Sequence, residues 1–384
     1  MSPRSGTTST ASTATPPVLR VVLAGGGTAG HVSPMIQIAR AIQRAHPQAE
    51  ITMVGTREGL EADLVPAAGF RLVTIPKVPM PRTVNKDLFS MPFRLRAAIK
   101  ASREILRDRR AQVVVGVGGY AATPVYLAAQ RERIPVVVHE GNIRPGLANK
   151  VGARRAAAVA TAFEGTPLPG ARHVGMPLRR EITTLDTSVA AQRRARQSLG
   201  LDPDRTTVVV TGGSSGAQHL NETIAASREA MTATGAQILH LTGKGKTILD
   251  ENGAPICEDG YRQVEYIDGL ETVFQAADLV VARSGAGTVC ELAAVGKPAV
   301  LVPLPIGNGE QRLNGAGLVD AGAAVMVDDQ DFTVEWVRTH LPALLNDPQR
   351  LATMAEAAAA QGVTDADEVM AQIVTEVVTQ HAGD

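Results

Sequence analysis

The sequence predicts an α/β protein in which two doubly wound parallel-sheet domains face each other across a cleft. Its 384 residues suit two or three domains, and 44% apolar with 20% charged residues is typical of a soluble globular protein. Short β-branched runs alternate with helical stretches, which favours parallel sheets covered on both faces. The alternation starts at residue 19 and restarts at residue 206, which predicts the second domain.

Each half of the chain has six predicted strands. Those of the first half span residues 19–23, 51–54, 71–75, 113–117, 136–139 and 158–161. Those of the second half span residues 206–211, 237–241, 262–266, 279–282, 299–302 and 324–327. The polar stretch 183–189 is the expected linker. We therefore expect domains over residues 18–180 and 181–364, with a C-terminal helix over 365–384 that crosses back onto the first domain.

Composition also bears on location. Residues 1–17 are rich in Ser, Thr, Ala and Pro without the apolar core of a secretory signal, so we expect a disordered tail. No uncharged apolar run approaches the length of about eighteen residues that a membrane-spanning helix needs, so any membrane contact is expected to be peripheral. Two cysteines, Cys257 and Cys290, are too few for a disulfide framework and favour a reducing cytoplasm.

The net charge of zero conceals an asymmetry between the halves. Residues 1–180 hold 25 Lys and Arg against 10 Asp and Glu, a balance of +15, which leaves 13 against 28, a balance of −15, for residues 181–384. Such asymmetry suggests that one half faces an anionic partner, either a membrane or nucleic acid. Few aromatic residues and no nucleic-acid module argue against nucleic acid.

Ten basic residues of the first half fall between residues 76 and 110, interleaved with apolar side chains. This pattern predicts a surface that docks on anionic headgroups. Its candidate membrane contacts are Lys77, Arg82, Lys86, Phe89, Phe93, Arg94 and Arg96. A solvated helical face over residues 97–110 is the alternative.

A glycine loop follows the first predicted strand, with Gly25, Gly27 and Gly30 in the spacing G-x-G-x-x-G. The spacing is typical of a dinucleotide-binding loop, as in an NAD(P)-dependent oxidoreductase, in which an acid about twenty residues further on binds ribose. Glu50 has that separation but precedes its strand instead of ending it. Tight packing of strand and helix is another reading, which explains Gly30 but not His31 at the mouth of the cleft.

Two further loops of small residues, 212–217 and 283–291, lie between a strand and a helix in the second half. Glycine loops after the first strand of each domain predict a phosphate-bearing ligand held between the domains, with tight turns as the alternative. Glu291 either accepts hydrogen bonds from ribose hydroxyls or is an acid favoured by the helix dipole. Gln311 and Asn314 either contact sugar hydroxyls or cap the next helix.

Polar groups also follow the fourth and fifth predicted strands, in Gly118-Gly119-Tyr120 and His139-Glu140-Gly141-Asn142. Polar groups next to buried strands are costly unless they have a role, so these are expected to face the cleft. A single histidine is more often structural, and His139 alone is not assigned to catalysis. Asp202-Pro203-Asp204 imitates the D-x-D of metal-dependent sugar transferases, but its position predicts a turn, and no metal site is expected.

Seven blocks, in order from about residue 19 to about residue 380, closely resemble the MurG family. They are residues 26–31, 118–120, 139–142, 175–179, 212–217, 283–291 and 308–314. The resemblance implies a GT-B fold of two Rossmann-like domains and a UDP-GlcNAc:lipid I N-acetylglucosaminyltransferase, peripheral at the cytoplasmic membrane face, in peptidoglycan synthesis. Departures from the family pattern are Ala29 for glycine, Gly141 and Ser215 for glutamine, and Met176 for asparagine.

The same resemblance implies the site. The residues that it implies for donor binding are Thr28, Ala29, Gly30, Asn142, Arg179, Ser214, Ile267 through its backbone, Ala286, Gly287, Thr288, Val289, Cys290, Glu291 and Gln311. His31 becomes the candidate base and Glu140 a second candidate, with Tyr120, His139 and Asn221 as further cleft residues. It implies UDP-GlcNAc and lipid I as substrates, no obligatory metal or cofactor, and cell-wall synthesis proteins as candidate partners. The rival classes are an NAD(P) oxidoreductase and a noncatalytic adaptor on anionic membranes.

Overall fold

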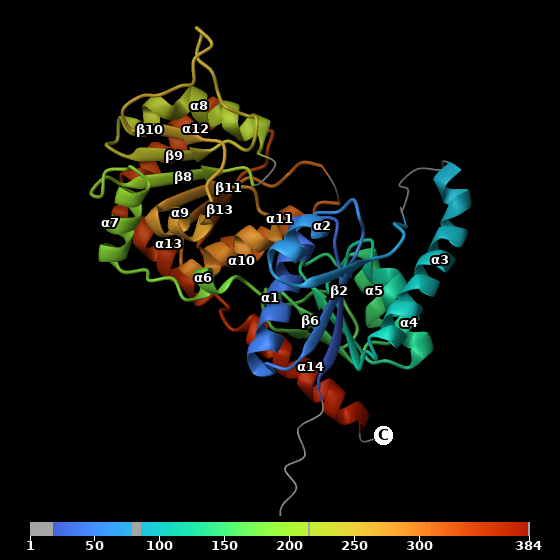
Figure 1. The fold of residues 1–384 in the computed structure, drawn as a ribbon. Coiled ribbons are helices and arrows are strands. Elements are labelled where there is room, and N and C mark those ends of the chain that lie inside the picture. Colours follow the sequence, from blue (N-terminus) through green and yellow to red (C-terminus); the bar gives the residue numbers. More distant parts are fainter. Residues whose placement is uncertain (1–17, 79–85, 214–215, 307, 383–384) are drawn as a thin grey trace, which may run out of the picture.

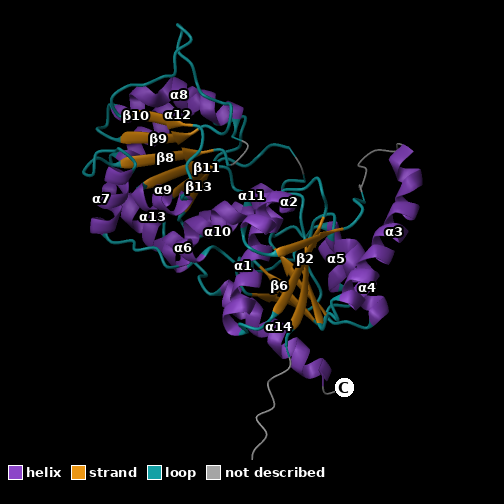
Figure 2. Ribbon diagram, viewed as in Figure 1, coloured by secondary structure: helices purple, strands orange, loops and turns teal. Residues whose placement is uncertain are grey.

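The computed structural model describes residues 18–78, 86–213, 216–306 and 308–382, with the side chains of residues 86–90 left out (Figure 1). Two parallel sheets form the centres of two lobes (Figure 2). The strand order is β3-β2-β1-β4-β5-β6-β7 in the first sheet and β10-β9-β8-β11-β12-β13 in the second, and every pairing is parallel. The predicted fold class is confirmed.

The first sheet contains the six predicted strands of the first half, each within one residue at either end, and one more. Its strands are β1 (Arg20–Ala24), β2 (Glu50–Gly55), β3 (Arg71–Thr74), β4 (Val113–Gly116), β5 (Val136–Glu140), β6 (Ala158–Thr161) and β7 (Ala171–His173). The sequence pattern misses β7 because its three residues are all exposed at the sheet edge, where no apolar alternation marks a strand.

The second sheet matches its predicted strands to within two residues. They are β8 (Thr207–Thr211), β9 (Gln237–Leu241), β10 (Tyr261–Val264), β11 (Leu279–Ala282), β12 (Ala299–Leu301) and β13 (Ala324–Met326). Before β8, the backbone N–H of Asp204 donates to the Asp202 carboxylate at 2.8 Å, which is a turn as predicted.

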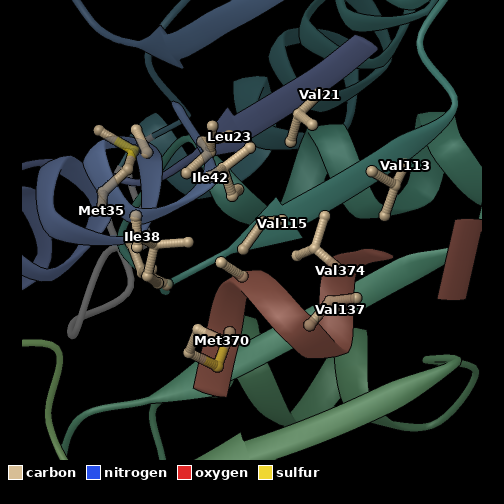
Figure 3. Packing of buried hydrophobic residues seen from close by; sticks show 14 of the residues in the cluster. Val21, Leu23, Met35, Ile38, Ile42, Val113, Val115, Val137, Met370 and Val374 are labelled. Atoms are coloured by element: carbon tan, nitrogen blue, oxygen red, sulfur yellow. The ribbon is translucent and has the colours of Figure 1, made fainter. Parts of the chain in front are cut away.

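Helices cover both faces of the first sheet. They are α1 (Ala29–Ala45), α2 (Glu61–Ala67), α3 (Lys86–Asp108), α4 (Ala122–Glu132), α5 (Leu147–Ala153) and the C-terminal α14 (Ala366–Ala382). On one face, α1 and α14 pack side by side over the sheet, with Met35, Ile38, Met370 and Val374 buried against strand residues such as Val115 (Figure 3). Helices α3, α4 and α5 pack on the other face. The C-terminal helix thus belongs to the core of the first lobe.

The second sheet is covered in the same way. Its helices, with the short connecting α6, are α6 (Arg180–Thr183), α7 (Val189–Ser198), α8 (Gln218–Thr232), α9 (Leu270–Ala276), α10 (Ala286–Val295), α11 (Glu310–Asp320), α12 (Val334–Leu345) and α13 (Pro348–Ala360). Residues of α9, α10 and α11 are buried on one face and residues of α8 and α12 on the other. Among the helices described, none is both long and apolar enough to cross a membrane.

The strand orders place the functional loops. In each sheet the strand order reverses beside the first strand, between β1 and β4 and between β8 and β11. Ligands of doubly wound sheets bind at this reversal, outside the carboxyl ends of the strands. The loops after β1 and β4 in the first sheet, and after β8 and β11 in the second, are the glycine-containing loops singled out above.

Candidate active site

The first glycine loop joins β1 to α1 at the carboxyl edge of the first sheet. Gly26 and Gly27 have φ angles of 151° and 91°, a region that favours glycine. The loop delivers Thr28 to the N-cap of α1, where its carbonyl accepts the first hydrogen bonds of the helix. The amides of Ala29 and Gly30, in the exposed first turn, precede those bonds and can meet a ligand oxygen.

His31 stands in this first turn, and one ring nitrogen is already engaged. Its Nδ1 lies 2.9 Å from the Thr28 hydroxyl oxygen. Its Nε2 faces the loop after β4, where a Cβ at Gly118 would come within 3.2 Å. Burial lowers the pKa of His31, although the charges of Glu140 and Glu61 oppose this. A neutral imidazole with Nε2 free is suited to accept a proton.

Glu140, the second candidate base, is 2% exposed at the end of β5. Its carboxylate accepts hydrogen bonds from the backbone N–H groups of Asn142 and Gly146, both at 2.9 Å, and from Asn149 Nδ2 at 3.0 Å. Asn149 is oriented in turn by the Tyr126 hydroxyl at 2.7 Å. These three hydrogen bonds fix the carboxylate in place, so the geometry favours Glu140 as the support of the loop after β5.

A cavity of about 410 Å³ lies at this edge, and both domains line it. The second domain contributes Asn308 and Glu310, while α3 contributes the apolar Met91 and Leu95. Predicted site residues that meet in this one cavity are Thr28, His31, Tyr120, Glu140 and Asn142. The space therefore suits a reaction between a group held by each domain.

Two predicted cleft residues lie in the interior instead. His139 is 1% exposed, and its Nε2 is 2.9 Å from the Gly175 carbonyl oxygen. Asn221 is equally buried, donates to the Thr242 carbonyl at 2.8 Å and lies 3.1 Å from His240 Nε2. Neither side chain reaches the cleft. The expectation for both was wrong because a polar residue at a strand end, such as His139, or in the first turns of a helix, such as Asn221, can be satisfied internally as well as by a ligand.

The N-terminus of α10 forms the second part of the candidate site. Gly285 is the N-cap, and Val289 N–H is the group that bonds back to its carbonyl. The preceding amides, of Ala286, Gly287 and Thr288, lie in the positively polarised first turn. Such a turn binds phosphate oxygens without a side chain.

Glu291 is partly buried one turn into α10, beside two charged side chains. Burial raises the pKa of Glu291 to about 7, with Arg179 opposing and Glu271 adding to the shift. Arg179 Nη1 is 3.2 Å from Glu271 Oε2. Arg179 and Glu291 were both predicted, and the structure places them in one cluster.

Other predicted donor residues have different surroundings. Within the described chain, the backbone N–H and carbonyl of Ile267 have no protein partner, which leaves both for a ligand. The Gln311 side-chain oxygen accepts the Leu304 N–H at 3.0 Å. Val289 and Cys290 line a separate interdomain cavity of about 400 Å³. Ser214 lies outside the described residues.

A buried amide connects the two domains. Asn314 on α11 is 1% exposed, and its oxygen accepts the Ile143 N–H at 3.0 Å while its nitrogen donates to the Asn142 side-chain oxygen at 3.2 Å. Arg144 also donates to the Asn308 carbonyl. Asn314 is therefore an interdomain contact, which neither sequence reading of it anticipates.

The predicted membrane cluster lies mainly on and before α3, which runs along one side of the first lobe (Figure 1). Phe93 is 78% exposed and Arg96 is exposed beside it. Lys77 lies instead over Tyr120, which lines the cavity, with its ammonium 5.9 Å from the ring centroid. Arg94 is exposed on the same helix. Arg82, and the side chains of Lys86 and Phe89, fall outside the described set.

The acid that the dinucleotide interpretation needs does not lie at the glycine loop. Glu50, the acid of the dinucleotide reading, begins β2 at the opposite edge from the glycine loop and pairs with Arg20 at 3.1 Å.

Glu61, which sequence reasoning missed, accepts the Gly27 N–H at 2.7 Å. Its only sequence signal is an acid in the first turn of a helix that follows a strand.

Comparison with known proteins assigns the chain to a family. Models of the glycosyltransferase family 28 N-terminal and C-terminal domains match residues 21–161 and 207–370. A Paenarthrobacter aurescens UDP-N-acetylglucosamine–N-acetylmuramyl-(pentapeptide) pyrophosphoryl-undecaprenol N-acetylglucosamine transferase is 57% identical over 361 residues, 94% of this chain and 97% of the relative. The Streptomyces coelicolor protein of that name is 47% identical, over 95% and 100%.

A solved structure supports the same family assignment. The crystal structure of Acinetobacter baumannii MurG is 25% identical and superposes with a TM-score of 0.74, over 93% of this chain and 99% of that one. The GT-B architecture expected from the resemblance is confirmed. The matching family is a transferase family, and neither an oxidoreductase nor an adaptor family. The chain belongs to the MurG family of N-acetylglucosamine transferases, within glycosyltransferase family 28.

Proposed function

We propose that this chain moves N-acetylglucosamine from UDP-GlcNAc to the 4-hydroxyl of the N-acetylmuramyl sugar of lipid I, with inversion, to give lipid II. The observation that carries the proposal is the interdomain cavity, where His31 and Thr28 of one domain face Asn308 and Glu310 of the other. A transferase of two substrates needs such a meeting point, because proximity and orientation supply much of the rate.

His31 takes the proton in the proposed step. The hydroxyl oxygen forms a bond to the anomeric carbon of GlcNAc, the bond from that carbon to the phosphate oxygen breaks, and its electron pair leaves with UDP. When His31 Nδ1–H donates to Thr28, Nε2 keeps the lone pair that accepts the hydroxyl proton. General-base catalysis of this kind contributes about 10²–10⁴-fold to the rate.

The leaving diphosphate is stabilised by fixed dipoles and one cation. Charge grows on UDP as the bond breaks, so the amides of the α10 first turn and the Arg179 guanidinium become more favourable in the transition state. The Ile267 backbone pairs with the uracil of UDP, Glu291 accepts hydrogen bonds from the ribose hydroxyls, and Gln311 contacts the GlcNAc sugar. No obligatory metal or cofactor takes part.

The acceptor is a lipid, so the first domain needs a membrane surface. We propose that α3 docks on the anionic cytoplasmic face of the membrane, with Phe93 entering the headgroup layer and Arg96 meeting lipid phosphates. The apolar Met91 and Leu95 of the same helix line the cavity, which connects the docking surface to the reaction site.

The deciding experiment is UDP release from UDP-GlcNAc with and without a lipid I analogue. We expect release that depends on the acceptor, and thermal stabilisation by UDP and UDP-GlcNAc. Stabilisation by a nicotinamide nucleotide instead would favour an oxidoreductase, and vesicle binding without acceptor-dependent release would favour an adaptor. Either result overturns the proposal.

A further inference from the structure

Beneath the first glycine loop lies a buried carboxylate that no step above uses. Glu61, in the first turn of α2, is 0% exposed. Its Oε2 accepts the Gly27 N–H at 2.7 Å, and its Oε1 accepts the backbone N–H and the hydroxyl of Thr56, both at 2.8 Å. Glu61 therefore ties the ends of β1 and β2 together directly behind the loop that carries His31.

Three glycines make room for this carboxylate. A Cβ at Gly26 would lie 2.4 Å from the Glu61 carboxyl carbon, one at Gly55 would lie 2.4 Å from its Cγ, and one at Gly59 would lie 2.1 Å from Oε2. No real Cβ tolerates these distances. Gly26 lies in the loop after β1, Gly55 ends β2 and Gly59 lies in the loop that follows it, so a side chain at any of the three would have to displace the Glu61 carboxylate.

The charge of Glu61 is unusual in this setting. Within the described chain, no Lys, Arg or His pairs with it. Burial alone raises the pKa of Glu61, but the hydrogen bonds from Gly27 and Thr56 outweigh burial, so the pKa falls below its ordinary value and the group stays charged. An unpaired buried charge is costly, and a fold could tie the same turns with neutral groups.

The nearest functional consequence of that charge is at His31. The negative charge of Glu61 raises the pKa of the imidazole, as does that of Glu140, against the effect of burial. Glu140 lies in the cavity wall and is the carboxylate that the family resemblance singles out, whereas Glu61 lies behind the loop. The two carboxylates therefore act on the ring from different elements.

We propose that Glu61 is a positioning residue for the transfer reaction: it holds the Gly27 amide so that the loop presents Thr28 and His31 to the acceptor, and its charge stabilises the imidazolium that forms when His31 takes the hydroxyl proton. This inference rests on the proposed role of His31 as the base. It also means that the Gly27 N–H is occupied, so ligand oxygens are left with the amides of the α1 first turn.

The test is Glu61→Gln, with Asp63→Asn as the matched control. Gln keeps the size and can still accept from Thr56, but it offers an N–H₂ to the Gly27 N–H and carries no charge. Asp63 is an exposed carboxylate on the same helix. We expect Glu61→Gln to lower kcat by about ten-fold or more, the loss typical of one hydrogen bond to a charged group, and Asp63→Asn to match wild type.

The pH profile separates a charge effect from simple loosening. Without the Glu61 charge the pKa of His31 falls further, so the acid limb of kcat/KM should move to lower pH. Thr56→Val removes one donor but keeps the charge, so it should leave the limb in place. In a His31→Ala background Glu61→Gln should have little further effect, because the group that it acts on is gone. The KM for UDP-GlcNAc should stay within about two-fold, because the amides of the α10 first turn and Glu291, which hold the donor in the proposed step, lie in the second domain, away from Glu61.

Each outcome has one reading. Thermal unfolding and UDP binding by each variant establish that it is folded. If Glu61→Gln does not fold, the test falls to Thr56→Val. An acid limb of kcat/KM that moves to lower pH in Thr56→Val then overturns the proposal, and an unmoved limb supports it. Wild-type kcat and pH profile in folded Glu61→Gln, or a lower kcat with an unmoved limb, overturn the role of Glu61 alone. If the wild type is active and His31→Ala is fully active too, the assignment of His31 as the base is overturned. No acceptor-dependent release by wild type overturns the proposed function itself.

Discussion

Asn142 and Asn314 hydrogen-bond to each other across the domain interface, 172 residues apart in the chain, with 3.2 Å between the Asn314 nitrogen and the Asn142 oxygen. Asn142 follows β5, in the wall of the reaction cavity, and Asn314 lies on α11, one turn after Gln311. The pair therefore links the loop beside the acceptor cavity to the helix that contributes a candidate donor residue.

Asn314→Asp should weaken this link. The carboxylate can still accept the Ile143 N–H. Its second oxygen replaces the Asn314 nitrogen that donates to the Asn142 oxygen, so two acceptors face each other there. A buried polar atom left unpaired costs about 1–3 kcal/mol, so we expect a less closed average structure and a lower kcat. Small-angle scattering and steady-state kinetics measure both. Asn346→Asp, at an exposed asparagine of the same domain, is the control; equal behaviour of the two variants would contradict the link.

His31→Ala should lower turnover by about 10²–10⁴-fold at saturating donor and acceptor, the contribution of a general base. In wild type, burial holds the pKa of His31 below 6.5, so kcat/KM should be flat near pH 7 and fall only below pH 6.5 as the ring takes up a proton. The pH profile of initial rates tests this. Near-full turnover of His31→Ala, with UDP binding unchanged, would remove the base assignment.

Glu291 should make donor binding depend on pH near neutrality. Burial raises its pKa to about 7, and a carboxylate that accepts ribose hydroxyls must be charged, so UDP-GlcNAc affinity should fall as pH drops below 7. Binding at pH 6 should release a proton, which calorimetry in two buffers of different ionisation heat detects. Glu291→Gln should bind more weakly without that dependence. Glu229→Gln, at an exposed site on α8, should behave as wild type; a pH-independent wild type would exclude the role.

The α3 surface should bind anionic vesicles in a salt-dependent way. Changing Arg82, Lys86, Arg94 and Arg96 to Gln should weaken binding to phosphatidylglycerol vesicles, with about 1 kcal/mol per basic residue near the surface, and added salt should reduce the difference. Phe93→Ser should weaken binding at all salt concentrations. Arg172→Gln, exposed on β7 at the far edge of the sheet, is the control. Unchanged vesicle sedimentation would make the cluster a plain solvated face.

Local features of the sequence determined most of the fold and part of the site. β-branched runs between glycine turns predicted twelve of the strands, because backbone sterics and apolar periodicity act over a few residues. The positions of Thr28, His31 and the α10 amides follow from the same rules, since a loop between a strand and a helix ends at the ligand-binding edge of a parallel sheet.

Partner choice depended on the tertiary structure. The contact of Glu61 with Gly27 spans 34 residues and that of Asn314 with Asn142 spans 172, and no local pattern encodes either. His139 and Asn221 have the same sequence appearance as cleft residues, yet internal acceptors and donors satisfy them. Whether a polar side chain meets a ligand or its own protein depends on which elements the topology brings beside it, and the sequence alone determines the elements but not their neighbours.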